Sequence, residues 1–163
     1  MGGGASTGGS YVERLTAPAA LWAGVVVLAL ALGLSFYAAL GPVAGLVAVL
    51  LPGITLSVLL ARTTTEVRVE SGTLRAGAAQ IPVGCLGPAR ALDAEQSRRV
   101  RGPESDPAGF HLIRGWVPAG VQAEVVDPHD PTPYWFVASR DPVALAAAIE
   151  GAREDVSPRT AGP

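Results

Sequence analysis

The chain has 163 residues, of which 49% are hydrophobic and only 16% are charged, whereas roughly 25% are charged in an average soluble protein. The formal net charge is −2 and all 12 basic residues are arginines, so composition gives no support for binding nucleic acid, which normally needs a basic face. The single cysteine, Cys85, excludes an intramolecular disulfide and a thiolate zinc cluster. The low charge content predicts contact with a membrane.

The chain begins with a glycine-rich stretch, "MGGGASTGG", that offers too few apolar side chains to form a core. We therefore expect residues 1–12 to form a disordered N-terminal segment.

The stretch between Arg14 and Arg62 contains no charged residue and no histidine. As one helix it would extend about 70 Å, whereas a bilayer core is about 30 Å thick and needs about 20 residues for each crossing. Gly41-Pro42, which breaks a helix, lies near the middle of this stretch. Residues 13–62 are therefore predicted to form a transmembrane hairpin of two helices, at about 18–40 and 43–61.

The arginines that flank the hairpin predict its orientation. Arg14 and Arg62 lie at its open ends, whereas the turn carries no charge, so the positive-inside rule places both termini in the cytoplasm and the chain in the inner (cell) membrane. The spans contain no ionisable residue, which argues against a transport path and favours an anchor. Ala29 and Gly33 have the small-residue spacing of a helix-packing face. Such a face could also join two copies of the chain, so a homo-oligomer formed through the spans is a second possibility.

From residue 63 onward the pattern becomes alternating. In "TEVRVE", Val67 and Val69 alternate with charged side chains, as in a half-buried strand, and Ser71-Gly72 supplies a hairpin turn. Further strands are expected around Leu74 and Ala76, in "AAQIPVGCL", and over residues 110–117, 121–126 and 134–139.

Two helices are predicted in the same region. Asp93 caps the first, with Gln96 in the capping-box position and Gly102 at its end. Asp141 and Pro142 begin the second, which precedes a flexible tail over residues 152–163. Residues 63–151 thus predict a small β-rich (α+β) cytoplasmic domain, on the plan of a pleckstrin-homology-like barrel with six or seven antiparallel strands and a C-terminal helix.

Five short motifs are distributed along the chain: Tyr11 to Leu15, Leu74 to Gly77, Ile81-Pro82, Arg114 to Val117, and the stretch "DPHDPTPYW" from Asp127 to Trp135. Together they resemble a family of actinobacterial membrane proteins catalogued as a domain of unknown function. The resemblance covers roughly residues 11–150 and implies no activity or cofactor. More distantly, the chain resembles bacterial membrane proteins that join a helical hairpin to a pleckstrin-homology-like domain.

The Asp-Pro stretch is the candidate metal site. Asp127, His129 and Asp130, joined by His111, carry the carboxylates and imidazoles that hold zinc or iron. The alternative is a stiff turn, because a short Asp side chain before proline can bond a backbone amide two residues on. The chain has no H-x-x-x-H or H-E-x-x-H spacing, so the turn is favoured and no metal or other cofactor is expected.

Two further groups are candidates for contact with a partner or a lipid. Arg98, Arg99 and Arg101 form the densest basic cluster, which could meet anionic headgroups or form a solvated helix face. Trp116, Tyr134 and Trp135 are either core or an aromatic docking face. Because strand residues alternate between faces, one of Tyr134 and Trp135 is expected to be exposed or covered by the terminal helix.

The sequence contains no recognisable catalytic motif. The first hypothesis is a non-enzymatic, membrane-anchored cytoplasmic module that binds a protein partner or lipid headgroups. The alternatives are a membrane-bound metal-dependent enzyme that uses the Asp127-His129-Asp130 loop, and an accessory subunit of a membrane complex.

Overall fold

The structure is a computed structural model that describes residues 10–103 and 105–156. The chain separates into two compact units, one formed by residues 16–64 and the other by the segments on either side of them. The expectations for residues 1–9 and 157–163 lie outside the described residues.

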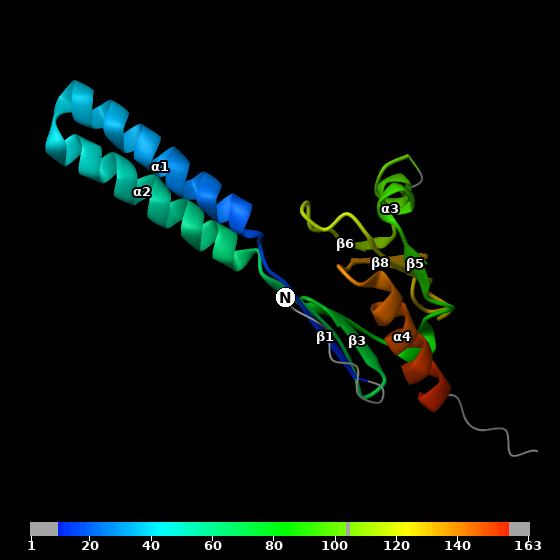
Figure 1. Cartoon of the computed structure of the whole chain (residues 1–163). Coiled ribbons are helices and arrows are strands. Elements are labelled where there is room, and N and C mark those ends of the chain that lie inside the picture. The colour runs from blue at the N-terminus through cyan, green and yellow to red at the C-terminus, as the bar shows by residue number, and fades with distance from the viewer. Residues whose placement is uncertain (1–9, 104, 157–163) are drawn as a thin grey trace, which may run out of the picture. The chain divides into compact units, whose positions relative to one another are not determined.

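The first unit is the helical hairpin that the sequence predicts. Helix α1 spans Ala19–Leu40, helix α2 spans Pro42–Arg62, and Gly41, with φ of 91°, forms the turn between them. The two helices lie side by side (Figure 1), and α2 continues through Pro52. Both helices are long and apolar enough to cross a membrane.

Glycines set the distance between the two helices. Of the residues in α1, Ala29 and Gly33 are buried, and Gly45 is buried in α2. A Cβ atom on Gly33 would lie 3.2 Å from the Gly45 carbonyl oxygen, and one on Gly45 would lie 3.0 Å from the Gly33 carbonyl oxygen. The predicted packing face at Ala29 and Gly33 is therefore confirmed, and it is used within the hairpin.

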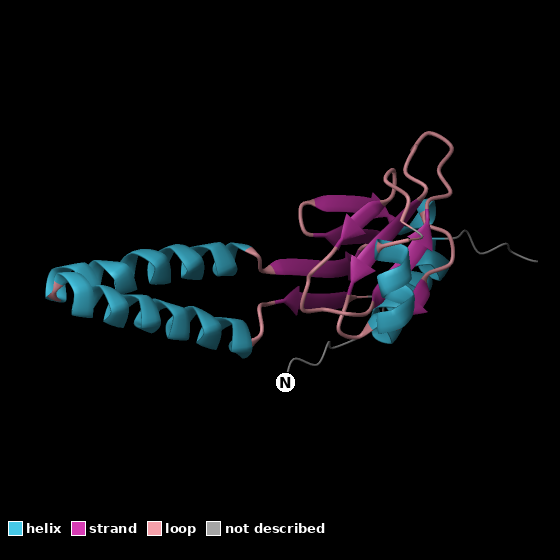
Figure 2. Cartoon of the chain, turned by 90° about the horizontal axis from the view of Figure 1, so that it is seen from above, coloured by secondary structure: helices cyan, strands magenta, loops and turns pink. Residues whose placement is uncertain are grey.

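The second unit contains two four-stranded sheets. The first has the order β1-β2-β3-β4, all antiparallel, and the second has the order β5-β7-β8-β6, in which β6 and β8 are parallel. Figure 2 shows the strands in magenta. The strands are β1 (Tyr11–Leu15), β2 (Thr65–Glu70), β3 (Thr73–Ala76), β4 (Ala79–Pro82), β5 (Arg90–Leu92), β6 (Phe110–Leu112), β7 (Gly120–Glu124) and β8 (Tyr134–Ala138). Helix α3 spans Ala94–Arg101, helix α4 spans Pro142–Val156, and a short 3-10 helix spans Val83–Cys85.

The fold class is therefore α+β, with two apolar helices and a β-rich unit. The single antiparallel barrel is not observed, because the described strands form two sheets and no closed barrel, and one strand pair is parallel. Helix α4 contacts strands of both sheets. The core of this unit contains residues from every strand and from α3 and α4, and it contains none from residues 16–64.

Several predicted elements are confirmed. Strand β2 occupies "TEVRVE", and Ser71 and Gly72 form the turn that leads into β3. Asp93 and Gln96 form the predicted capping box at the start of α3. At the start of α4, the Ala144 N–H donates to Asp141 Oδ1 at 3.0 Å, as expected of a cap.

Several elements differ from the predictions. Strand β1 includes residues assigned to the disordered segment and to the hairpin. Strand β5 was not expected. The strand predicted over residues 110–117 ends at Leu112, because a turn closes between Arg114 O and Val117 N at 2.9 Å. Helix α4 continues past Gly151 to Val156, since a buried Ala152 and an Arg153–Glu150 ion pair offset the roughly 1 kcal/mol cost of glycine in a helix.

Candidate functional site

The Asp-Pro stretch forms two consecutive turns closed by its own carboxylates. Asp127 Oδ1 accepts the N–H of His129 at 2.9 Å, and Asp130 Oδ1 accepts the N–H of Thr132 at 2.9 Å. The backbone donor from His129 lowers the pKa of the Asp127 carboxyl below its usual range. These are the local side chain–backbone bonds of the turn interpretation, and they stiffen the approach to β8.

The two histidines of the candidate metal site lie in different surroundings. His129 is highly exposed, and its Nδ1 lies 3.3 Å from Asp127 Oδ1. His111 has Nδ1 3.0 Å from the Gly109 carbonyl oxygen and Nε2 3.0 Å from the Tyr134 hydroxyl. A carbonyl can only accept, so Nδ1 donates to it, and in the neutral imidazole Nε2 then accepts from Tyr134. Within residues 10–103 and 105–156, no group of three His, Cys, Asp or Glu side chains is arranged to hold a metal ion.

Tyr134 and Trp135 are both buried, so neither offers an exposed docking surface. The Tyr134 hydroxyl accepts the N–H of Asp106 at 3.0 Å, and the Trp135 ring lies 4.1 Å from the Phe110 ring. Every residue of β8 is buried, because this interior strand is covered on both faces. Neither residue is exposed: Trp135 packs against Phe110 of β6, and the loop before β6 donates to the Tyr134 hydroxyl.

Trp116 is half-buried and packs against the core. Its Nε1 is buried and has no hydrogen-bond partner among the described residues. The ring is therefore held by apolar packing.

The basic cluster on α3 divides into two parts. Arg101 is used internally: its Nη2 donates to the Pro118 carbonyl oxygen at 2.9 Å, and its guanidinium lies 5.8 Å from the centre of the Phe136 ring. Arg98 pairs with Glu95 one turn earlier and stays exposed, and Arg99 is exposed as well. Two of the three predicted contact arginines therefore face solvent.

A polar network joins the start of the chain to the start of α4. Glu13 Oε2 accepts the Ser139 hydroxyl at 2.6 Å and the Tyr11 hydroxyl at 2.9 Å, while Glu13 Oε1 accepts the N–H of Arg140 at 2.8 Å. Ser139 Oγ also accepts the N–H of Asp141 at 3.1 Å. Tyr11 and Ser139 are buried, so this network fixes β1 to the junction of β8 and α4.

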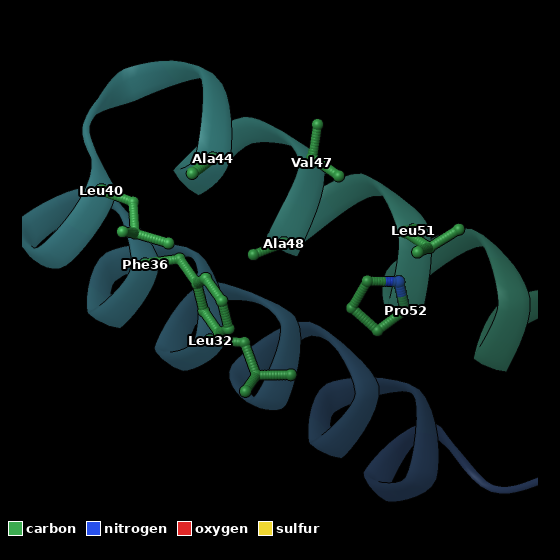
Figure 3. A pocket seen from close by; sticks show the side chains of 8 residues that line it. All are labelled: Leu32, Phe36, Leu40, Ala44, Val47, Ala48, Leu51 and Pro52. Atoms are coloured by element: carbon green, nitrogen blue, oxygen red, sulfur yellow. The ribbon is translucent and has the colours of Figure 1, made fainter.

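The hairpin carries an apolar groove. Figure 3 shows side chains from both helices around it, and the cavity measures about 590 Å³. Its lining contains no ionisable group: Leu32, Phe36, Leu40, Ala44, Val47, Ala48, Leu51 and Pro52. Pro52 has no N–H, so the Ala48 carbonyl lacks its usual helical donor beside this groove.

One family model, described as "Protein of unknown function (DUF3093)", matches residues 10–149. The chain belongs to this family. No curated protein and no solved structure matches it. The match begins at the start of β1 and ends within α4, so the DUF3093 domain includes the hairpin together with both sheets.

Sequence reasoning missed the roles of Glu13 and Ser139 in this DUF3093 protein. Glu13 lies in the first motif that carried the resemblance, but the residues of that motif were assigned to the disordered segment and to the hairpin. The available signal was the alternation of Tyr11, Glu13 and Leu15, which is typical of a strand. Glu13 and Ser139 are 126 residues apart in the sequence, so no local pattern could predict their hydrogen bond.

Burial of Tyr11 gives an alkaline pH dependence that can be measured. Burial raises the pKa of the Tyr11 hydroxyl to about 12, so the folded state favours the neutral phenol. Its stabilising contribution is therefore complete below about pH 10, where the unfolded tyrosine titrates, and is lost as the pH rises toward 12.

Between pH 10 and 12, we expect the unfolding free energy of the wild type to fall with pH more steeply than that of Tyr11→Phe, by about 1.4 kcal/mol per pH unit. Urea unfolding of the full chain in detergent, followed by near-UV circular dichroism, measures this slope. Equal slopes for the wild type and Tyr11→Phe would contradict the prediction.

Proposed function

We propose that this chain is a non-enzymatic binding or scaffold module held at the inner membrane by its helical hairpin, with the β-rich unit and both termini in the cytoplasm. The observation that carries the proposal is the insertion of two membrane-length helices between two strands paired in one sheet. The unit so anchored contains closed turns and packed aromatics at the positions considered for metal or catalysis.

The strand pairing supports a common side for the two termini. Leu15, four residues before α1, is the antiparallel partner of Thr65, three residues after α2. Two crossings return the chain to the side from which it started, so the pairing requires no passage of a folded strand through the bilayer. Arg14 and Arg62 flank the hairpin and the Gly41-Pro42 turn is uncharged, which favours the cytoplasm for the open ends.

The β-rich unit supports a pleckstrin-homology-like plan in two respects. It has two small sheets, and a C-terminal helix contacts strands of both. The parallel pairing of β6 with β8 departs from an all-antiparallel plan. Such a fold would not assign a ligand, because one fold can serve many functions. The exclusive use of arginine as basic residue supports an actinobacterial source with a GC-rich genome.

The binding partner is a protein or a lipid headgroup, and Arg98 and Arg99 are the contact residues we favour. Both are exposed on α3, whereas Arg101, Tyr134 and Trp135 are engaged inside the unit. An anionic headgroup or an acidic protein surface would each match exposed guanidinium groups.

Thiol labelling tests the topology. In a Cys85→Ser background, Pro42→Cys marks the turn and Ala78→Cys marks an exposed turn of the β-rich unit. We expect a membrane-impermeant maleimide to label Pro42→Cys on intact spheroplasts and Ala78→Cys only after lysis. The parent without cysteine controls for background labelling. Labelling of Ala78→Cys on intact spheroplasts, or recovery of the chain in the soluble fraction, would overturn the proposal.

A further inference from the structure

The strands on either side of the hairpin are both bound by polar side chains from outside the first sheet. On the entry side, Glu13 of β1 accepts two hydroxyls and one backbone N–H, of which Ser139 and Arg140 supply one each. On the exit side, Arg114 Nη2 donates to the hydroxyl of Thr65, the first residue of β2. We call these contacts the entry clamp and the exit clamp.

Strand β1 depends on such contacts because of its position in the sheet. It is five residues long and lies at an edge, where it pairs with β2. Its outward residues Val12 and Arg14 are exposed, whereas Tyr11 and Leu15 are buried. A short edge strand with a single neighbour is the part of a sheet that opens most easily.

The entry clamp combines two buried hydroxyls with a half-buried carboxylate. The Ser139 hydroxyl is fully buried and donates to Glu13, and the Tyr11 hydroxyl is buried and donates to the same oxygen. Removing the carboxylate would leave both hydroxyls without that acceptor, which is costly in a buried site. The network therefore favours a docked β1 over an undocked one.

We propose that the two clamps form a conformational device that holds β1 and β2 in place within the β-rich unit, with Glu13 and Arg114 as positioning residues. Strand β1 acts as a strap: while the entry clamp is made, the chain entering α1 and the chain leaving α2 are held as register partners on one folded body. When the entry clamp opens, β1 leaves the sheet and the rest of the β-rich unit stays folded. This inference stands apart from the proposed membrane orientation, since it concerns contacts within the β-rich unit.

Hydrogen–deuterium exchange on the full chain in detergent tests the device. We expect Glu13→Gln to speed amide exchange in residues 11–15 by at least about tenfold, with less than about twofold change in β7 and β8 (a factor of ten corresponds to about 1.4 kcal/mol). Ser139→Ala, which removes one donor and keeps the carboxylate, should give a smaller rise in the same peptide. Arg114→Ala should speed exchange at the start of β2.

Matched controls and a rescue distinguish the strap from a general loss of stability. Glu124→Gln and Arg90→Ala change exposed groups of the same types and should leave exchange in β1 and β2 unchanged. Val12→Cys and Arg68→Cys, at paired positions, should form a disulfide in a Cys85→Ser background and restore slow exchange in Glu13→Gln. Unchanged exchange in β1 of Glu13→Gln, a rise of equal size throughout the β-rich unit, or failure of the formed disulfide to rescue would each overturn the proposal.

Discussion

Replacement of residues 16–64 by a two-residue turn is expected to give a folded domain that stays in solution without detergent. Leu15 and Thr65 are antiparallel partners at the ends of β1 and β2, so Asn-Gly between them would form an ordinary β-hairpin. The core of the β-rich unit contains no residue from the excised segment. Excision therefore removes both candidate spans without opening the core.

The expected result is a shift of the product from the membrane fraction to the soluble fraction, with a cooperative thermal transition and the near-UV dichroism of a packed aromatic core. Size-exclusion chromatography and circular dichroism measure these properties. The full chain in detergent gives the reference spectrum. The same excision with Phe136→Ala, which truncates a fully buried ring, should lose about 3–5 kcal/mol and serves as the unfolded-prone control. A product that aggregates, or that stays with the membranes, would contradict the independence of the unit.

The hairpin was predictable from the sequence, whereas the pairing of the strands on either side of it was not. Forty-seven consecutive uncharged residues (15–61), interrupted by Gly41-Pro42, are a local signal that needs no tertiary information. Strand β1 is five residues long, and its partner lies beyond both helices. The pairing is invisible locally, and so residues 11 and 12 were assigned to a disordered segment although they enter a sheet.

The second sheet shows the same division between local and distant information. The capping box at Asp93 and Gln96 was predicted because both partners lie within one helical turn. Strand β5 has only three residues, and it exists because it pairs with β7, about 30 residues later. The parallel pairing of β6 with β8 likewise follows from tertiary packing, and no local pattern distinguishes it from the antiparallel pairing that was expected.

The candidate sites were predictable to the extent that their bonds are local. The turns at Asp127 and Asp130 follow from short carboxylate side chains and neighbouring prolines, and the structure contains the bonds expected of them. His111 and Tyr134 meet across 23 residues, and Glu13 and Ser139 across 126, so no spacing rule could pair them. Alternation alone also misjudged β8, because an interior strand with both faces covered buries every residue.

The second large effect is expected at the contact between the two helices. Gly45→Val should force α1 and α2 apart, because a Cβ atom at position 45 would lie 2.7 Å from Tyr37 Cβ and 3.0 Å from the Gly33 carbonyl oxygen. Two of its near neighbours, the Gly33 oxygen and Tyr37 Cα, are backbone atoms, so a change of rotamer cannot relieve the clash. Overpacking of this kind costs about 1–3 kcal/mol. Thermal unfolding of the full chain in detergent should therefore show a lower midpoint for the helical signal.

Gly24→Val is the matched control for this substitution. Gly24 lies in α1, and a Cβ atom there would meet nothing within 4 Å, so the same change of residue type adds a branched side chain without a clash. Intrinsic helix propensity changes alike at the two positions, and the difference between the variants isolates the interhelical contact. If Gly45→Val and Gly24→Val unfold at the same midpoint, the close approach at Gly33 and Gly45 does not hold the hairpin together. If Gly45→Val alone is destabilised, the small residues of α1 and α2 pack against each other within one chain. Any association between copies must then use the remaining faces of the two helices.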